Sequence, residues 1–315
     1  MTIASRPAAL DAERSIEIRV PLDLRRTLGI HRRGPRDPAL RFEASGSAWR
    51  ATRTPEGPVT LFLEARDGVL RSRAWGPGSA WALGRVEDLV GLADRPESLV
   101  PQHRIVADAT LRLRGLRIGR TEAVIEALVP AILEQKVLGD EARRAWVGLV
   151  RRYGEDAPGP PGLRLPPTSE VLAGLPYYAF HPFGVERRRA DLIRAVARDA
   201  PRLERLAATA SGPSGDPAPA YARLRSIPGI GPWTASEVGI RAFGDADAVS
   251  VGDFHLPNIV AWALAGEPRG TDERMLELLE PYRGHRGRVL RLLELSGAGP
   301  GRRAPRLPKQ PIDAF

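Results

Sequence analysis

The spacing of apolar residues changes once along the chain, and this change restricts the fold more than any other feature of the sequence. Residues 15–20 (SIEIRV) and 59–65 (VTLFLEA) alternate apolar with polar side chains, as strands with one buried face do. Beyond about residue 112 the apolar residues recur every three or four positions, which is the spacing of amphipathic helices. We therefore predict an α+β protein, with a small β-rich amino-terminal domain over residues 1–112 and an all-helical domain over residues 113–297.

Helices are expected throughout the second domain, separated by loops rich in proline and glycine. The apolar spacing predicts helices over residues 121–137, 139–154, 183–200, 272–284 and 285–297. Pro130 is expected to kink or restart the first of these helices, and Asp140 is expected to cap the second. Residues 298–315 are rich in Gly, Pro and Arg, which predicts a flexible basic tail.

Composition narrows the chemistry that the chain can perform. It has 315 residues, enough for two domains, and no cysteine, which excludes disulfides, catalytic thiolates and cysteine-held metal clusters. The five histidines lack metal-ligand spacing, and no stretch is apolar enough to cross a membrane. With 47 basic and 38 acidic side chains the net charge is +9, which favours a polyanionic partner such as nucleic acid. The charged amino terminus is unlike a secretion signal, so a cytoplasmic, nucleoid-associated protein is expected.

The segment RSIPGIGPWTASE, residues 225–237, places a Gly-x-Gly turn between two predicted helices. A dinucleotide-binding fingerprint would need a third glycine where Thr234 stands, and a Walker loop would need G-K-[ST], so neither nucleotide site is predicted. Glycines let the turn approach another backbone closely, and the N–H groups at the start of the second helix favour an anion such as phosphate. The alternative is a plain hairpin of two helices whose glycines only permit close packing.

Two stretches resemble a known family. Residues 224–256, LRSIPGIGPWTASEVGIRAFGDADAVSVGDFHL, resemble the helix-hairpin-helix segment of the HhH-GPD superfamily of DNA glycosylases, with its Gly/Pro-rich loop and following aspartate. Residues 131–137, AILEQKV, resemble the glutamine-bearing helix of the bacterial inducible 3-methyladenine DNA glycosylases of type II. Those enzymes also begin with a small β-rich domain, so the resemblance implies their fold over most of the chain.

The resemblance also implies which residues contact DNA. They are the three of the hairpin turn (Gly229, Ile230, Gly231), two whose amides would bind a phosphate (Trp233, Thr234) and two on the helix that faces the lesion (Gln135, Lys136). The family allows a monovalent cation at the turn, and no metal or other cofactor is expected. The expected partner is double-stranded DNA containing damaged bases, bound by a monomer.

Asp253, in the sequence VGDF, falls where the family carries its catalytic carboxylate. Cleavage of an N-glycosidic bond builds positive charge on the sugar, and a fixed anion stabilises that charge and can orient or deprotonate water. An alkylated purine is already a cationic leaving group, so a single carboxylate suffices. The alternative role of Asp253 is a cap for the helix that follows, and both roles can hold together. Asp245 and Asp247 are interpreted as turn and cap residues.

The lysine content bears on the type of reaction. Members of the family that also cut the DNA strand form a Schiff base through a lysine two positions after the second hairpin glycine. Here that position is Trp233, and the chain has only two lysines, Lys136 and Lys309. The resemblance therefore implies a monofunctional hydrolase.

The residues expected around the flipped base depart from the family pattern. Lys136 replaces an apolar wedge, and it could either reach a phosphate or fill the gap that the flipped base leaves with its aliphatic stem. Glu237 replaces an aromatic residue, and it is predicted either to favour a cationic base or to be a solvated helix residue. Stacking on the base would then depend on Trp233 or on Tyr177 and Tyr178, for which the alternative is a packing role.

We therefore expect a monofunctional DNA glycosylase that flips out alkylated bases of the 3-methyladenine type and hydrolyses their N-glycosidic bond in base excision repair. Two alternatives stay open on the sequence. One is a non-catalytic helix-hairpin-helix protein that binds DNA, and the other is a glycosylase for oxidised or deaminated bases.

Overall fold

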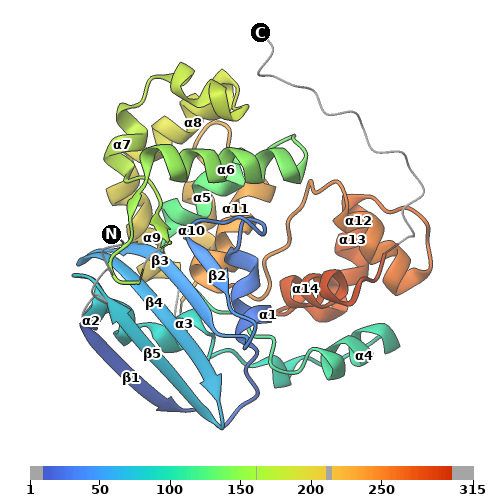
Figure 1. Ribbon diagram of the computed structural model, residues 1–315. Coiled ribbons are helices and arrows are strands. Elements are labelled where there is room, and N and C mark those ends of the chain that lie inside the picture. The colour runs from blue at the N-terminus through green and yellow to red at the C-terminus, as the bar shows by residue number, and fades with distance from the viewer. Residues whose placement is uncertain (1–9, 161, 211–214, 300–315) are drawn as a thin grey trace.

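The amino-terminal part of the chain folds into one antiparallel sheet, as the alternating pattern predicts (Figure 1). The computed structural model describes residues 10–160, 162–210 and 215–299. The strand order is β1-β5-β4-β3-β2, with β1 Ala12–Glu17, β2 Leu40–Phe42, β3 Ala48–Thr54, β4 Gly57–Arg66 and β5 Val69–Trp75. Most of the described chain after the sheet is helical, so the predicted α+β class is confirmed.

One face of the sheet carries the apolar core of this part. Val59, Leu61 and Leu63 alternate along β4 and are at most 2% exposed. They pack in one cluster with residues of three helices, α1 Leu24–Leu28, α2 Ser79–Gly84 and α3 Val86–Leu89. Burial of each such side chain contributes about 1.5–3 kcal/mol, so the alternation fixes which face of the strand points inward.

The same face of the sheet meets the helical part through a buried ion pair. Arg50 lies opposite Leu61 in the β3–β4 register, so both side chains emerge on the core face. Arg50 Nη2 lies 2.6 Å from Oε1 of Glu126 on α5 Val124–Leu133, and Thr52 Oγ1 donates to Oε2 of the same carboxylate. A buried guanidinium needs a partner, and Glu126 supplies it from the helical part.

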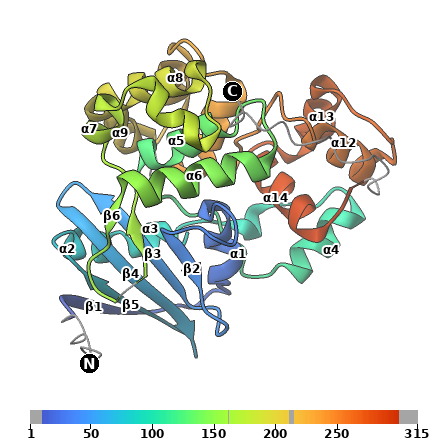
Figure 2. The same cartoon turned by 45° about the horizontal axis from the view of Figure 1, so that its top comes forward.

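The helices after the sheet form two packed groups, which lie apart in Figures 1 and 2. The first, called here the hairpin lobe, contains α5, α6 Gly139–Tyr153, α7 Ser169–Gly174, η3 Tyr177–Phe183, α8 Arg187–Arg198, α9 Ala200–Ala210, α10 Ala218–Arg225, α11 Pro232–Val238 and η4 Gly239–Phe243. The second, called the carboxyl-terminal lobe, contains α4 Arg104–Arg112, α12 Leu256–Val260, η5 Ala261–Ala265, α13 Asp272–Leu279, η6 Glu280–Tyr282 and α14 Arg286–Ser296. Each lobe has its own apolar cluster, and the crossing segment, residues 244–255, connects them.

Helix α5 ends earlier than the sequence predicts. Its last residue is Leu133, so the expected continuation to residue 137 is wrong, and Gln135 and Lys136 lie beyond the helix. Lys136 has a φ of +54°, in the left-handed region that stops a helix. The carbonyl of Leu133 accepts a hydrogen bond from Arg189 Nη1 at 2.6 Å, which stabilises this early end from another helix. Pro130 lies inside α5 and does not restart it.

Three further expectations are corrected or left outside the described chain. Helix α6 begins at Gly139, so Asp140 lies in its first turn instead of capping it. The loop predicted after α6 contains a short ladder of β6 Glu155–Asp156 with β7 Arg164–Leu165. Most of the predicted basic tail, residues 300–315, lies outside the described residues. In the part of the chain that the structure describes, no helix has the length and apolar character needed to span a membrane.

Candidate functional site

The Gly-Ile-Gly sequence of residues 229–231 forms the predicted hairpin turn between α10 and α11. Gly229 has a φ of +97°, and a Cβ on it would lie 3.0 Å from a methyl group of Leu192. Glycine is therefore required at this position for both backbone and packing reasons. Ile230 is 5% exposed and anchors the turn in the apolar core of the hairpin lobe. Gly231 is extended and is the N-cap residue of α11.

The start of α11 presents backbone donors at the molecular surface. Pro232, the first residue of the helix, has no N–H and is exposed. The amides of Trp233 and Thr234 belong to the first helical turn, which has no intrahelical acceptor for them. Because α11 runs directly into η4, the aligned peptide dipoles also favour an anion at this end.

Gln135 ties the end of α5 to the hairpin. Its Nε2 donates to the carbonyl of Gly229 at 3.0 Å and to Thr234 Oγ1 at 2.9 Å. Three of the residues predicted to contact DNA are thus held together. Lys136 follows directly and is exposed. The side chain of Gln135 stabilises the turn through its amide nitrogen, so its oxygen is the atom that remains for another partner.

Asp253 lies beside the hairpin and also caps a helix. Its Oδ2 accepts a hydrogen bond from Trp233 Nε1 at 3.0 Å. Its Oδ1 accepts from the backbone N–H groups of His255 at 2.7 Å and Leu256 at 3.0 Å, at the start of α12. A carboxylate offers about four lone-pair directions. Three are occupied in the described chain, which leaves one on Oδ2 for another partner.

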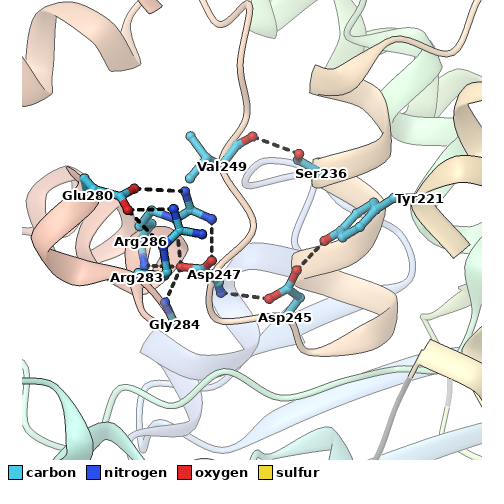
Figure 3. Close-up of polar contacts among 9 residues, drawn as sticks. All are labelled: Tyr221, Ser236, Asp245, Asp247, Val249, Glu280, Arg283, Gly284 and Arg286. Carbon is cyan, nitrogen blue, oxygen red and sulfur yellow. Dashed lines mark hydrogen bonds and ion pairs between the residues drawn. The ribbon is translucent and has the colours of Figure 1, made fainter. Parts of the chain in front are cut away.

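At its beginning, the crossing segment that leads to Asp253 is hydrogen-bonded to the hairpin lobe (Figure 3). Asp245 Oδ2 accepts from the hydroxyl of Tyr221 at 2.5 Å, and its Oδ1 accepts from the amide of Asp247 at 2.8 Å. Ser236 Oγ donates to the carbonyl of Val249 at 2.8 Å. Burial raises the pKa of Asp245 and also that of the Tyr221 hydroxyl. The pair therefore keeps its hydrogen-bonding proton over the physiological range.

Two residues further on, the segment is held by the carboxyl-terminal lobe (Figure 3). Asp247 Oδ1 accepts from the amides of Gly284 at 2.7 Å and Arg286 at 3.0 Å, and the Arg286 guanidinium lies 2.5 Å from Oδ2. Burial acts to raise the pKa of Asp247, but the bonds from Arg286 and Gly284 outweigh it, so the pKa lies below its ordinary value. Asp247 thus caps α14 across the gap between the lobes, and the predicted turn and cap roles of the two aspartates describe their contacts well.

Glu237 lies one turn after Trp233 and is ion-paired. Its Oε2 lies 2.5 Å from Arg241 Nη1, and its Oε1 accepts from Ser250 Oγ at 2.7 Å. The Glu237 side chain is only 15% exposed, so the expectation of a solvated helix residue is wrong. Burial acts to raise its pKa, but Arg241 and the Ser250 hydroxyl lower it below the ordinary value. The carboxylate is therefore charged and neutralised within the protein.

Tyr177 and Tyr178, the two tyrosines predicted to stack on the flipped base, lie on η3, and the rings that they contact also belong to η3. Tyr177 contacts the rings of Tyr178 and His181 edge-on, and the Arg187 guanidinium lies 4.7 Å from the Tyr177 ring centroid. Tyr178 is 63% exposed. The structure therefore brings Trp233, and not these tyrosines, to the carboxylate of Asp253.

Two arginines that support the site carry no clear signal in the sequence. Arg189 is 3% exposed and holds the carbonyl of Leu133, just before Gln135. Arg33, in the amino-terminal part, lies 3.0 Å from Glu134 and is 7% exposed. Both contacts join residues far apart in sequence, so helical spacing could not predict them.

The chain is similar to known proteins in sequence and in fold. No family model matches the chain. It is 30% identical over 183 residues to the probable bifunctional transcriptional activator/DNA repair enzyme AlkA of Mycobacterium tuberculosis, over 56% of this chain and 35% of that protein. The chain thus spans about a third of the length of this curated relative.

Solved structures show the same fold. The 3-methyladenine DNA glycosylase of Archaeoglobus fulgidus superposes with a TM-score of 0.73 at 21% identity, over 90% of this chain and 97% of that one. The 8-oxoguanine glycosylase/lyase of Clostridium acetobutylicum superposes with a TM-score of 0.68 at 12% identity, over 92% and 99% of the two chains. In sequence the chain is similar to a protein described as a DNA repair enzyme, and in fold it is similar to a 3-methyladenine and an 8-oxoguanine DNA glycosylase.

Proposed function

We propose that the protein is a monofunctional DNA glycosylase, which hydrolyses the N-glycosidic bond of alkylated bases of the 3-methyladenine type in double-stranded DNA. The observation that carries the proposal is the position of Asp253. Its carboxylate is fixed by three N–H donors and lies within hydrogen-bond distance of Trp233, at the start of the helix that follows the hairpin turn. The similarity to a protein described as a DNA repair enzyme supports the same activity.

The geometry supports a simple order of events. The amides of Trp233 and Thr234 bind a phosphate without reading sequence, which holds the strand next to the turn. A nucleotide rotated out of the duplex at that point would place its base against the Trp233 indole and its sugar next to the Asp253 carboxylate, which the indole N–H holds in position. The C1′–N bond then breaks, and its electron pair leaves with the base, which becomes neutral if it was cationic. Asp253 stabilises the positive sugar until the oxygen of water bonds to C1′ and a proton is released.

A strand-cleaving reaction is not part of the proposal, because Trp233 stands where the related lyases carry their Schiff-base lysine. The monovalent cation expected at the turn stays a prediction. The carbonyl of Gly229, which would be a candidate ligand, already accepts a hydrogen bond from Gln135.

The decisive experiment is release of bases from methylated DNA by the wild-type protein and by Asp253→Asn. Asparagine keeps one oxygen for the caps of α12, so the fold is retained, but it removes the negative charge. Loss of one electrostatic group of this kind typically lowers the rate about 10²–10³-fold, and we expect that loss with DNA affinity within about threefold of wild type. Equal release by both proteins would mean that Asp253 is only a cap, and no release by either would favour the non-catalytic DNA-binding alternative.

A further inference from the structure

Asp253 ends a tight turn that begins at Ser250. The amide of Asp253 donates to the carbonyl of Ser250 at 3.3 Å, and Gly252, the third residue of the turn, has a φ of +93°. This hydrogen bond with a left-handed third residue is typical of a type II turn, which favours glycine at that position. The backbone position of Asp253 therefore follows the position of Ser250, three residues earlier.

The side chain of Ser250 holds this turn against α11. Its Oγ donates to Oε1 of Glu237 at 2.7 Å, and Ser250 is only 6% exposed. The same helix carries Trp233 one turn before Glu237, so α11 bears both the amides at its start and the acceptor that holds the turn. On the side of the carboxyl-terminal lobe, the amide of Gly252 donates to Asp272 Oδ1 on α13 at 3.1 Å. The turn is thus bonded to both lobes.

Glu237 is itself fixed in place by Arg241. The Arg241 guanidinium donates to Oε2 of Glu237 at 2.5 Å, and its Nε donates to the carbonyl of Ile30 in the amino-terminal part at 3.2 Å. The side chains of Glu237 and Arg241 are 15% and 11% exposed. Both carboxylate oxygens of Glu237 have a partner, and a buried polar network that is satisfied in this way makes its surroundings rigid. Ser250 is therefore bonded to a fixed acceptor and not to a mobile surface side chain.

We propose that Glu237 is a positioning residue for the catalytic carboxylate, because through the Ser250 hydroxyl it sets how far Asp253 lies from the amides at the start of α11. The inference rests on the proposed function, in which those amides hold the DNA strand by a phosphate while Asp253 acts on a sugar of that strand. Covalent bonds limit the separation of phosphate and sugar along a strand, so the anion and the amides must keep a matching separation. A misplacement of about 1 Å can lower a rate about 10²-fold.

The other hydrogen bonds of Asp253 do not fix this separation on their own. Those from the amides of His255 and Leu256 come from its own segment, so they move with it. The bond from Trp233 depends on an indole that also has to meet the flipped base. The bond between Ser250 and Glu237 is made by neither the carboxylate nor the indole, so it can hold the turn while both of these groups contact the nucleotide.

The first test is a double-mutant cycle of Ser250→Ala and Asp253→Asn, measured as single-turnover release of bases from methylated DNA. Ser250→Ala removes one hydroxyl group, and we expect release about 10–100-fold slower than in wild type, with DNA affinity within about threefold. Because the hydroxyl acts through the carboxylate, Ser250→Ala should cause no further loss in the Asp253→Asn protein. Glutamine has one acceptor atom where Glu237 uses two, so Glu237→Gln should also slow release.

Ser79→Ala is the matched control for the loss of a buried serine hydroxyl. Ser79 is 5% exposed, and its Oγ donates to the carbonyl of Gly76 at 2.6 Å in the amino-terminal part. We expect the melting temperature to fall in Ser79→Ala as in Ser250→Ala, while the release rate of Ser79→Ala stays that of wild type. Equally slow release by both serine variants would trace the effect to lost stability and overturn the inference.

The indole N–H of Trp233 gives a readout that needs no catalysis, because it donates to Asp253. Its NMR resonance, assigned with Trp233→Phe, should shift in Ser250→Ala and Glu237→Gln toward its position in Asp253→Ala, and should stay unchanged in Ser79→Ala. An unchanged resonance or an unchanged release rate in folded Ser250→Ala would overturn the inference, even if Asp253 proves essential for release. So would a loss of rate that is just as large in the Asp253→Asn protein, whereas equal release by wild type and Asp253→Asn would refute the proposed function itself.

Discussion

The contact between Gln135 and the hairpin gives a prediction that can be worked out from the structure. Gln135→Ala removes the two hydrogen bonds that Nε2 donates to Gly229 and Thr234. Each intramolecular hydrogen bond contributes about 1 ± 0.5 kcal/mol, so the free energy of unfolding should fall by about 1–3 kcal/mol. The melting temperature should then fall by several degrees, at about 2–4 °C per kcal/mol in domains of 150–250 residues.

The effect on DNA binding distinguishes a support for the turn from a direct contact with the lesion. If Gln135 acts by holding the turn, Gln135→Ala should weaken binding to damaged and undamaged duplexes by the same factor, because phosphate contacts carry no sequence information. Fluorescence anisotropy with both duplexes at one salt concentration measures the two affinities. The matched control is Gln102→Ala, because Gln102 is an exposed glutamine just before α4. Weaker binding of the damaged duplex alone, with unchanged stability, would refute the reasoning and assign Gln135 to the lesion.

Two further predictions concern the dependence of stability on pH. Asp247 has a lowered pKa in the folded protein, so its contribution to stability is present above its ordinary pKa of 3.8 and is lost as the pH falls through the folded value. Urea unfolding should therefore show Asp247→Asn less stable than wild type by about 1–3 kcal/mol at pH 7, with the difference shrinking below about pH 4. An equal difference at both pH values would contradict this. Glu204 accepts from the amides of Val124 and Ile125, and burial raises its pKa to about 7 from 4.5. Its folded form holds a proton more tightly than the unfolded chain, so the stability that it gives is complete below pH 4.5 and is lost as the pH rises through 7, by about 3 kcal/mol at 1.36 kcal/mol per unit. Urea unfolding of wild type and Glu204→Gln between pH 4.5 and 8 should show this slope only in the wild type, and parallel curves would argue against it.

The parts of the site that sequence predicts are those set by local spacing. The Gly-x-Gly turn requires a left-handed residue at Gly229, and the structure has it there. The strand pattern of residues 59–65 likewise predicts β4, because the alternation itself decides which side chains are buried. The spacing of Glu237 and Arg241 by four residues is also a local signal, from which their ion pair could have been predicted.

The parts that sequence does not predict depend on contacts between distant segments. The end of α5 is one example, since Arg189 reaches the carbonyl of Leu133 from a helix that follows 56 residues later. The role of Asp247 is another, because its partner Arg286 is 39 residues away and belongs to the other lobe. Nothing in the spacing of either residue distinguishes it from a solvated charge, and only the folded arrangement of the lobes defines its partner.

The attachment of the crossing segment to both lobes has a mechanical consequence. Asp245 is bound on one side of the gap and Asp247 on the other, with one residue between them, so there is almost no slack. If a duplex pressed the lobes apart, this short bridge would be stretched before either apolar cluster opened. The segment then returns to the hairpin lobe, where Val249 and Ser250 bond to Ser236 and Glu237, so the distance between the lobes and the position of Asp253 are set by the same few bonds.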